Sequence, residues 1–312
     1  MGSFPYSDTN KRYHTLDYYL RHRFGCKVVK VSLNGGFTCP NIDGTKGTGG
    51  CAFCTEGSGH FAGDPLEPIA TQLRKGRDLL TDKWGECPCI AYFQANTNTY
   101  CTVDKLRRLT DEALACPDVV GIAISTRPDC IPDDMLAFLT ELSQRTFLTV
   151  ELGLQTIHDG IALRLGRCHT YGDFTDAVDR LHAKGIDICA HIIDGLPGET
   201  FDMMMQTAEA VARLPLHSVK IHLLHILRGT RLAADYERGI YIPLTMDEYV
   251  DIVCSQLQVL PPSFVIERIT GDGAKADLIA PLWSLRKRSV LNAIDKRLAA
   301  LDTMQGAGYI CP

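Results

Sequence analysis

The chain has 312 residues, of which 45% are hydrophobic and 22% are charged, and its formal net charge is −5. These proportions are ordinary for a globular protein and exclude disorder as the general state. The acidic balance argues against a protein that coats DNA, although it allows a local basic patch. No stretch of about 18 apolar residues occurs and the first residues lack the apolar segment of a signal peptide, so we expect a soluble cytoplasmic protein with no membrane contact.

Cysteine is the unusual residue, with thirteen copies. The length of the chain and the odd count argue against the disulfide framework of a small secreted protein. Most of the cysteines stand singly in apolar segments, where a thiol usually acts as a small buried hydrophobic group. Two groups are clustered, and these are Cys39 with Cys51 and Cys54, and Cys87 with Cys89.

After a polar N-terminal arm, residues 1–25, short β-branched runs alternate with segments of helical spacing. The predicted strands are 28–33, 89–93, 119–125, 146–152, 187–193 and 218–224, and helices are predicted over 69–80, 103–113, 135–142 and 201–211. Near-continuous apolar runs are typical of parallel strands that are covered on both faces. We therefore expect an α/β fold with six β/α units, in which the chemistry lies in the loops after the carboxyl ends of the strands.

Residues 228–312 depart from this alternation. A helix is predicted over 245–260, where Pro261 and Pro262 end it, followed by a strand over 265–269 and a terminal helix over 289–301. The expected architecture is thus a partial (β/α)6 barrel, residues 26–227, with a C-terminal α/β extension packed on it.

The loop after the first predicted strand carries Cys39, Cys51 and Cys54 in a glycine-rich stretch. Glycine allows the tight turns that a chain needs in order to wrap a metal or cluster. A structural zinc site needs four closed ligands, and His60 would be the fourth. A [4Fe–4S] cluster held by three cysteines leaves one iron open to a further ligand, as a catalytic cluster requires. These residues favour the cluster and leave zinc as the alternative.

Phe53 precedes the last cysteine, and an aromatic residue in this position on the first loop of a partial barrel resembles the radical S-adenosylmethionine (SAM) superfamily. The eleven-residue gap between the first two cysteines is similar to that of the YhcC/YtqA-type bacterial family, relatives of the Elongator catalytic subunit and of oxygen-independent coproporphyrinogen oxidase. The resemblance continues in segments along the whole chain, and these are 91–100, 124–130, 150–159, 166–171, 191–200, 219–233, 267–273 and 281–295.

This resemblance implies that Cys39, Cys51 and Cys54 bind a [4Fe–4S] cluster and that SAM chelates its fourth iron. One electron, from a donor such as flavodoxin or ferredoxin, would cleave SAM to a 5′-deoxyadenosyl radical that abstracts hydrogen from the substrate. The implied cofactor-binding residues are Phe53, Thr97 toward the methionine amino group, Gln155 and Arg167 toward the ribose and carboxylate, and Gly195 and Pro197 beside the adenine. A guanidinium suits a carboxylate because it can bind it with two parallel hydrogen bonds, and we expect Arg167 at the barrel rim.

Simpler interpretations stand beside these roles. Residues 195–200 could form only a strand-to-helix turn with Thr200 as the helix cap, and Gln155 could bond barrel backbone. Cys87 and Cys89 could be a metal or redox pair, or could merely flank the second strand.

Other polar residues follow predicted strands. Arg127 and Asp129 come directly after the third strand, a position that favours a functional role. His222 and His225, on the sixth strand, are more often core or rim histidines than ligands. The remaining Asp and Glu residues are expected on solvated helix faces.

The relation to Elongator implies transfer RNA as the substrate, modified at the wobble-uridine side chain. Because the chain ends at residue 312, before the acetyltransferase domain that follows in Elongator, acetyl transfer is not implied. The cations that would contact phosphates, or would simply be solvated, are Lys220, Arg228, Arg231, Arg286, Lys287, Arg288, Lys296 and Arg297. The alternatives are a radical SAM enzyme that acts on a small molecule or tetrapyrrole, and a non-catalytic zinc or iron–sulfur RNA-binding protein.

Overall fold

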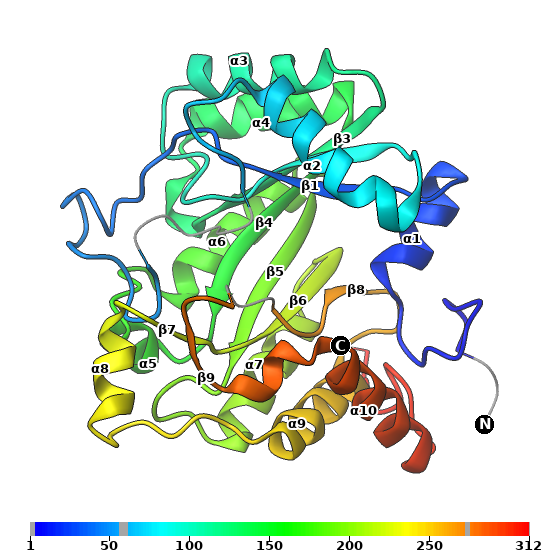
Figure 1. The fold of residues 1–312 in the computed structure, drawn as a ribbon, viewed down its shortest axis with the longest axis vertical. Helices are drawn as coiled ribbons and strands as arrows, with labels where there is room; N and C mark the ends of the chain where they lie inside the picture. Colours follow the sequence, from blue (N-terminus) through cyan, green and yellow to red (C-terminus); the bar gives the residue numbers. More distant parts are fainter. Residues whose placement is uncertain (1–3, 56–61, 272–274, 312) are drawn as a thin grey trace.

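The structure, a computed structural model, describes residues 4–55, 62–271 and 275–311. Its centre is a seven-stranded sheet in the order β1-β2-β3-β4-β5-β6-β8, and every neighbouring pair is parallel. The sheet curls into a half-barrel (Figure 1). Its strands are β1 (Val29–Leu33), β2 (Cys89–Phe93), β3 (Val119–Thr126), β4 (Phe147–Gln155), β5 (Asp187–Asp194), β6 (Ser218–Leu223) and β8 (Val265–Arg268).

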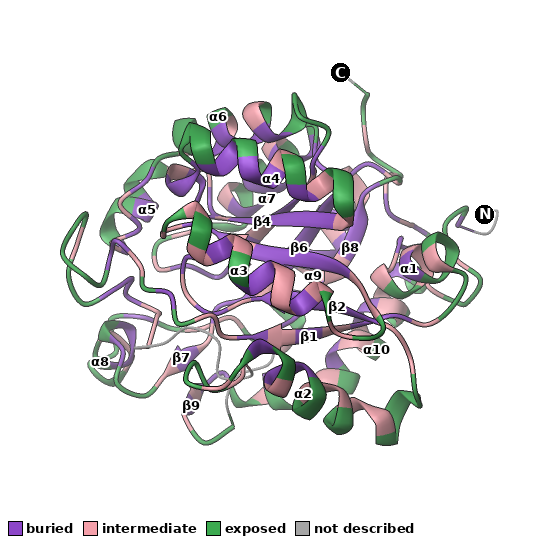
Figure 2. Ribbon diagram, turned by 90° about the horizontal axis from the view of Figure 1, so that it is seen from above, coloured by how far each residue is buried: buried purple, intermediate pink, exposed green. Residues whose placement is uncertain are grey.

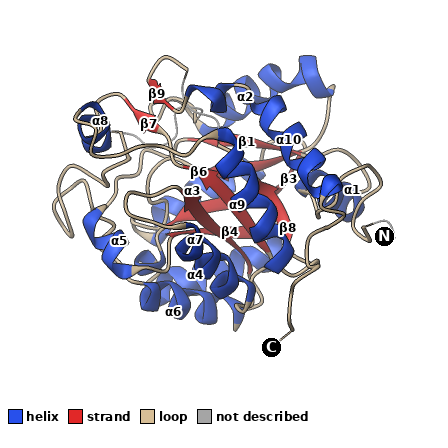
Figure 3. Ribbon diagram, turned by 90° about the horizontal axis from the view of Figure 1, so that it is seen from below, coloured by secondary structure: helices blue, strands red, loops and turns tan. Residues whose placement is uncertain are grey.

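Helices cover the convex side of the sheet, and Figure 3 shows α9 lying across the strands. Their inward sides and the strands are buried, while their outward sides are exposed (Figure 2). None of the described helices is long and apolar enough to cross a membrane. The helices are α1 (Leu16–Phe24), α2 (Ile69–Trp84), α3 (Val103–Leu114), α4 (Asp133–Arg145), α5 (Asp159–Arg164), α6 (Tyr171–His182), α7 (Phe201–Ala212), α8 (Arg231–Glu237), α9 (Met246–Val259) and α10 (Lys287–Ala300).

The predicted α/β half-barrel is confirmed, with one strand more than expected. All six predicted strands are present, and β4 runs three residues further than predicted. The strand predicted over 265–269 belongs to the same sheet, because β8 pairs with β6. Sequence periodicity missed this pairing because a long connection, rather than one helix, separates β6 from β8. The proposed division of the chain at residue 228 stays a prediction.

The N-terminal arm contains α1 and covers the outer edge of β8. Thr15 caps α1 by accepting a hydrogen bond from the backbone of Tyr18, at 3.1 Å. The backbone N–H of Ile266 donates to the carbonyl of His14 at 2.7 Å, and Thr15 forms a parallel bridge with Ile266. These contacts satisfy part of a strand edge that would otherwise be free to pair with another chain. A second, small sheet joins β7 (Ile226–Leu227) to β9 (Leu278–Ala280).

A network of buried charges crosses the inside of the half-barrel. Lys30 Nζ on β1 lies 2.9 Å from Glu151 Oε1 on β4 and 2.5 Å from Glu267 Oε2 on β8. Lys220 on β6 also bonds Glu151, and His191 Nε2 on β5 lies 2.8 Å from the same carboxylate. Since β1 and β8 are the two edges of the sheet, the Lys30–Glu267 ion pair joins those edges across the barrel.

Three of these positions correct the sequence-based expectations. Glu151 and Glu267 do not lie on solvated helix faces, since their side chains are buried inside the barrel. Lys220 is 5% exposed and paired with Glu151, so it cannot contribute to an exposed phosphate-binding face. Burial alone would raise the pKa of Glu151, but Lys220 and Lys30 outweigh it and hold that pKa well below its usual range.

Removing the charge of Glu151 with the isosteric substitution Glu151→Gln leaves two buried lysines without one of their carboxylates. We expect this change to lower the free energy of unfolding by about 3–5 kcal/mol, the usual cost of breaking a buried ion pair. Denaturant unfolding followed by circular dichroism measures it. Glu209→Gln, on the exposed side of α7, is the control and should have little effect. A loss no larger than that of the control would contradict the structural role of the network.

Candidate active site

One cavity of about 230 Å³ opens at the carboxyl ends of the strands, far more than the 10–15 Å³ or so that a single water needs. It is lined from the loops after β1, β2 and β3 and from the inner faces of β4, β5, β6 and β8. The predicted site residues that it brings together are Cys39, Cys51, Phe53, Cys54, Thr97, Gln155 and Arg167. Their convergence makes this cavity the candidate active site.

The loop that carries the cysteines is held in place by α5 and α8, which lie beside it in Figure 1. The backbone of Ala52 donates to the carbonyl of Leu165 at 2.8 Å and accepts from Leu232 at 3.0 Å. Arg231 adds a bond of 3.2 Å from its guanidinium to the carbonyl of Gly50. Gly50 has a φ of 73°, a conformation in which glycine carries no steric cost.

Hydrogen-bond donors converge on the sulfur of Cys51. Asn41 Nδ2 lies 3.4 Å from this sulfur and Arg167 Nη1 lies 3.6 Å from it. A hydrogen bond from Cys54 and the positive charge of Arg167 lower the pKa of Cys51 to about 5, against the effect of burial. Cys51 therefore favours the thiolate, the form that binds iron or zinc, whereas the hydrogen bond to Cys51 and burial raise the pKa of Cys54.

The three cysteines do not by themselves form a site for a single ion. Among the described residues, no three His, Cys, Asp or Glu side chains are grouped so that they could hold one metal ion. Each cysteine of a cluster binds a different iron, so three sulfurs around one cavity fit a cluster without meeting at a point. His60, the fourth ligand of the zinc alternative, lies outside the described residues.

Arg167 and Gln155 meet at the wall formed by β4. Arg167 lines the cavity at the carboxyl ends of the strands, but it is only 7% exposed and is not a solvated rim charge. Its Nη2 donates to the carbonyl of Gly153 at 2.8 Å. A bulge in β4 between Gly153 and Gln155, with Gln155 at a φ of 73°, turns the Gln155 side chain into the cavity. Arg167 Nε and Gln155 Oε1 are buried without a hydrogen-bond partner among the described residues. Unpaired buried polar atoms of this kind fit a site for a polar ligand such as SAM.

The loop after β2 is tied to the cysteine loop. The backbone of Thr97 donates to the carbonyl of Thr38 at 3.2 Å, and Asn96 Nδ2 donates to the carbonyl of Phe37 at 2.9 Å. Thr97 is buried in the cavity lining one residue after Asn96. Its predicted contact with the methionine amino group is compatible with this position and stays a prediction.

Gly195 and Pro197 do not line the cavity. The carbonyl of Gly195 accepts a hydrogen bond from the Tyr241 hydroxyl at 2.5 Å, and Thr200 caps α7. Gly195 has a φ of 83°, and an added Cβ would lie 2.9 Å from Leu244. The turn and its contacts are sufficient to explain why residue 195 is glycine. The predicted contact of Gly195 and Pro197 with the adenine stays a prediction.

The guanidinium of Arg127 is bonded to other protein groups and holds Arg167 in place. Its Nε and Nη2 bind the two carboxylate oxygens of Asp129 at 2.9 and 2.8 Å, and its Nη1 donates to the carbonyl of Arg167 at 2.8 Å. Burial would raise the pKa of Asp129, but hydrogen bonds from Arg127 and Lys46 lower it to about 2. Arg127 is therefore a positioning residue for Arg167.

Sequence reasoning missed several lining residues, and these are Asn41, Tyr92, His191 and Arg268, together with Lys220 in its buried position. Two of them could have been found from the sequence, because Lys220 and Arg268 are charged residues inside otherwise apolar strands. Cys87 and Cys89 lie at the opposite end of the sheet, since Cys89 pairs with the first residues of β1 and β3. They belong to the start of β2 and not to this cavity.

Comparison with known proteins agrees with this site. Residues 42–211 match the radical SAM superfamily, and residues 216–300 match the C-terminal domain described for radical SAM proteins. YtqA of Bacillus subtilis is 51% identical over 97% of this chain and 94% of its own. Protein YhcC of Escherichia coli is 34% identical over 89% of this chain and 90% of its own.

More distant similarity reaches proteins named for transfer RNA chemistry. The tRNA uridine(34) acetyltransferase of Methanocaldococcus jannaschii is 28% identical over 49% of this chain and 28% of its own. Among solved structures, Elp3 of Methanocaldococcus infernus superimposes with a TM-score of 0.67 at 17% identity, covering 89% of this chain and 64% of that one. The structural likeness supports the half-barrel fold.

Replacing Cys39, Cys51 or Cys54 singly by Ala should abolish both the iron–sulfur absorbance and the formation of 5′-deoxyadenosine, since each cysteine would hold a separate iron. Cys87→Ala, at the far end of the sheet, is the matched control and should keep both. Iron analysis and chromatography of the reconstituted protein measure these outcomes. Tightly bound zinc without iron after anaerobic purification would contradict the cluster assignment.

Gly153→Ala tests the wall that presents Arg167 and Gln155. The added Cβ would lie 2.8 Å from Gln155 Nε2 and 3.0 Å from Arg167 Nη2, so both side chains must move. We expect SAM affinity to fall by about tenfold, equivalent to about 1.4 kcal/mol, with cluster content unchanged. Equilibrium binding of SAM measures this. Gly172→Ala, where the nearest atom would be 3.5 Å away, is the control, and equal affinities in the two variants would argue against the assignment.

Proposed function

The chain belongs to the radical SAM superfamily, and we propose that it modifies transfer RNA at the side chain of the wobble uridine. It is an enzyme whose family cofactors are a [4Fe–4S] cluster and SAM. When bound, these cofactors supply a 5′-deoxyadenosyl radical that abstracts hydrogen from the substrate. The observation that carries the catalytic part of the proposal is the meeting, in one cavity, of three cysteines and two buried polar atoms without a hydrogen-bond partner among the described residues, Arg167 Nε and Gln155 Oε1.

The chain's own residues would divide the work of holding these groups. Cys39, Cys51 and Cys54 would hold the cluster, with Asn41 donating to the Cys51 sulfur. Arg167 and Gln155 would bind SAM through the atoms that lack partners. The buried walls around them would keep water away from a reactive intermediate.

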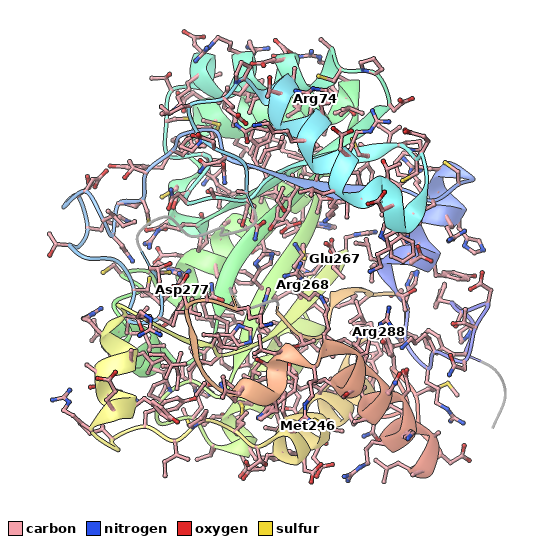
Figure 4. All side chains as sticks on the ribbon, viewed as in Figure 1. Arg74, Met246, Glu267, Arg268, Asp277 and Arg288 are labelled. Atoms are coloured by element: carbon pink, nitrogen blue, oxygen red, sulfur yellow. The ribbon has the colours of Figure 1, made fainter. Side chains whose placement is uncertain are left out.

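Support for transfer RNA comes from the relatives named above and from exposed cations near α10. Arg286 and Arg288, at the start of α10, and Lys296 within it are exposed, and Figure 4 labels Arg288. Arg297 is paired with Asp251 at 2.5 Å, so its charge is partly neutralised and it would attract a phosphate less strongly. The cationic face that we propose is therefore smaller than the sequence suggested.

A nucleotide would have to leave its stack to reach the cavity. The edges of bases in an A-form duplex are hidden in a deep and narrow groove, whereas an anticodon loop presents unstacked bases. We propose that such a base enters the barrel mouth in the cytoplasm, with flavodoxin or ferredoxin as the electron donor.

Mass spectrometry of transfer RNA nucleosides, from cells with and without the gene, tests this function. We expect a change confined to the wobble position. An unchanged profile with intact SAM cleavage would favour a small molecule or tetrapyrrole as the substrate. Absence of SAM cleavage by the reconstituted protein would favour a non-catalytic RNA-binding protein.

Changing Arg286, Lys287 and Arg288 together to Ala should weaken transfer RNA binding and reduce its salt dependence. Each phosphate contact adds about 0.7–0.9 to the slope of log affinity against log salt, so a loss of about two in the slope is expected. Filter binding at several salt concentrations measures it. The control changes Arg74, Arg108 and Lys184, exposed cations on other surfaces, to Ala. Equal slopes for the two triple variants would contradict a role for α10.

A further inference from the structure

The floor of the cavity carries an arginine that the cofactor roles do not use. Arg268 on β8 lines the cavity, and Figure 4 labels it beside Glu267 near the middle of the molecule. Within the described part of the chain, no hydrogen bond or ion pair joins its guanidinium to another residue. It pairs in register with Lys220, which in turn pairs with His191, so the three residues lie at one level of the sheet.

A bulge in β8 explains why the side chains of two consecutive charged residues, Glu267 and Arg268, both lie inside the barrel. Val219 pairs with Ile266 and Lys220 pairs with Arg268, so Glu267 is the extra residue. Side chains normally alternate between the two faces of a strand, and a bulge changes that alternation locally. Glu267 thus reaches Lys30 while Arg268 lines the cavity.

The charges on this floor do not balance. Lys30 and Lys220 are matched by Glu151 and Glu267, which leaves Arg268 as an additional positive charge. No described residue that lines the cavity is Asp or Glu. A positive charge in a partly enclosed cavity attracts an anion more strongly than one at an open surface, because less water screens it.

His222 adds a polar group without a partner at the same place. Its Nε2 atom is buried and has no hydrogen-bond partner among the described residues. Its ring centroid lies 5.2 Å from that of His191, and both histidines line the cavity. A neutral imidazole can donate one hydrogen bond from this nitrogen in one of its tautomers.

We propose that Arg268, with His222 beside it, binds an oxyanion of the substrate, either a carboxylate or a phosphate. The assignment rests on the proposed function for the idea that the oxyanion belongs to a nucleotide of RNA. We assign SAM to Arg167 rather than to Arg268, because Arg167 is the guanidinium that contacts Cys51. Arg268 is bonded to none of the cysteines or to Arg167 among the described residues.

The first experiment needs no RNA. Crystals of the reconstituted protein are soaked in selenate, whose selenium gives an anomalous signal. We expect a peak within hydrogen-bond distance of the Arg268 guanidinium in the wild type and in Arg74→Gln, and no peak in Arg268→Gln. Arg74 is an exposed residue of α2 (Figure 4) and is the matched control. A wild-type cavity without a peak would overturn the oxyanion site, whatever the substrate of the enzyme is.

The second experiment uses transfer RNA from cells that lack the gene. Arg268→Gln should raise the apparent KM about tenfold or more, the scale of a hydrogen bond to a charged group. SAM affinity and RNA-independent SAM cleavage should stay within about twofold of the wild type, and Arg268→Lys should recover part of the loss. A fall in SAM affinity with an unchanged KM would overturn the proposal by assigning Arg268 to the cofactor.

Filter binding of transfer RNA at several salt concentrations, with inhibition of the reaction by anions, separates the two sources of the oxyanion. If the group is a phosphate, the salt slope of RNA binding falls by about one in Arg268→Gln. If it is a carboxylate, the slope is unchanged, and acetate inhibits the wild type more than chloride at equal ionic strength. A selenate peak without any transfer RNA product would leave the oxyanion site standing and reject the proposed RNA substrate.

Discussion

The ion pair between Lys30 and Glu267 is the constraint on which the arrangement of the barrel depends. Seven parallel strands curl only part of the way to closure, so β1 and β8 face one another as the two edges of the sheet. A buried bond of 2.5 Å between them fixes how far the sheet curls. Glu151 extends the constraint to β4, β5 and β6, because it bonds Lys30, Lys220 and His191 together.

Such a network is a costly way to hold a sheet. Buried ion pairs often stabilise no more than apolar side chains of the same volume, because both partners lose their hydration. The convex side of this sheet carries an extensive apolar core that needs no charges. We infer that the charges are retained for the cavity above them, where Lys220 and His191 belong to both the network and the lining. The bulges in β4 and β8 act similarly, since each presents a polar side chain to the cavity.

The sequence predicts what depends on neighbouring residues and misses what depends on distant ones. Apolar runs predicted all six barrel strands, and the three cysteines could be recognised as a candidate cluster site because they lie on one loop. Glu151 gave no such signal, since its partner Lys30 is 121 residues away. Arg167 was expected as a charge at the barrel rim, yet it is buried by contacts with Gly153 and Cys51 that only folding brings about. Residues 195–200 illustrate the reverse case, in which local turn geometry accounts for a glycine without any ligand.

The composition of the cavity also bears on the kind of reaction that it can perform. Its described lining contains Arg127, Arg167, Lys220 and Arg268, but no carboxylate that could act as a general base. Burial lowers the pKa of His222 well below its usual range, so this imidazole is a weak proton acceptor at neutral pH. A reaction that removes a proton from carbon would need a better base. Removal of hydrogen as an atom needs none, because the proton and electron leave together. A cavity in which Arg167 and Arg268 have no carboxylate partner among the described residues therefore suits the radical chemistry on an anionic substrate that we propose.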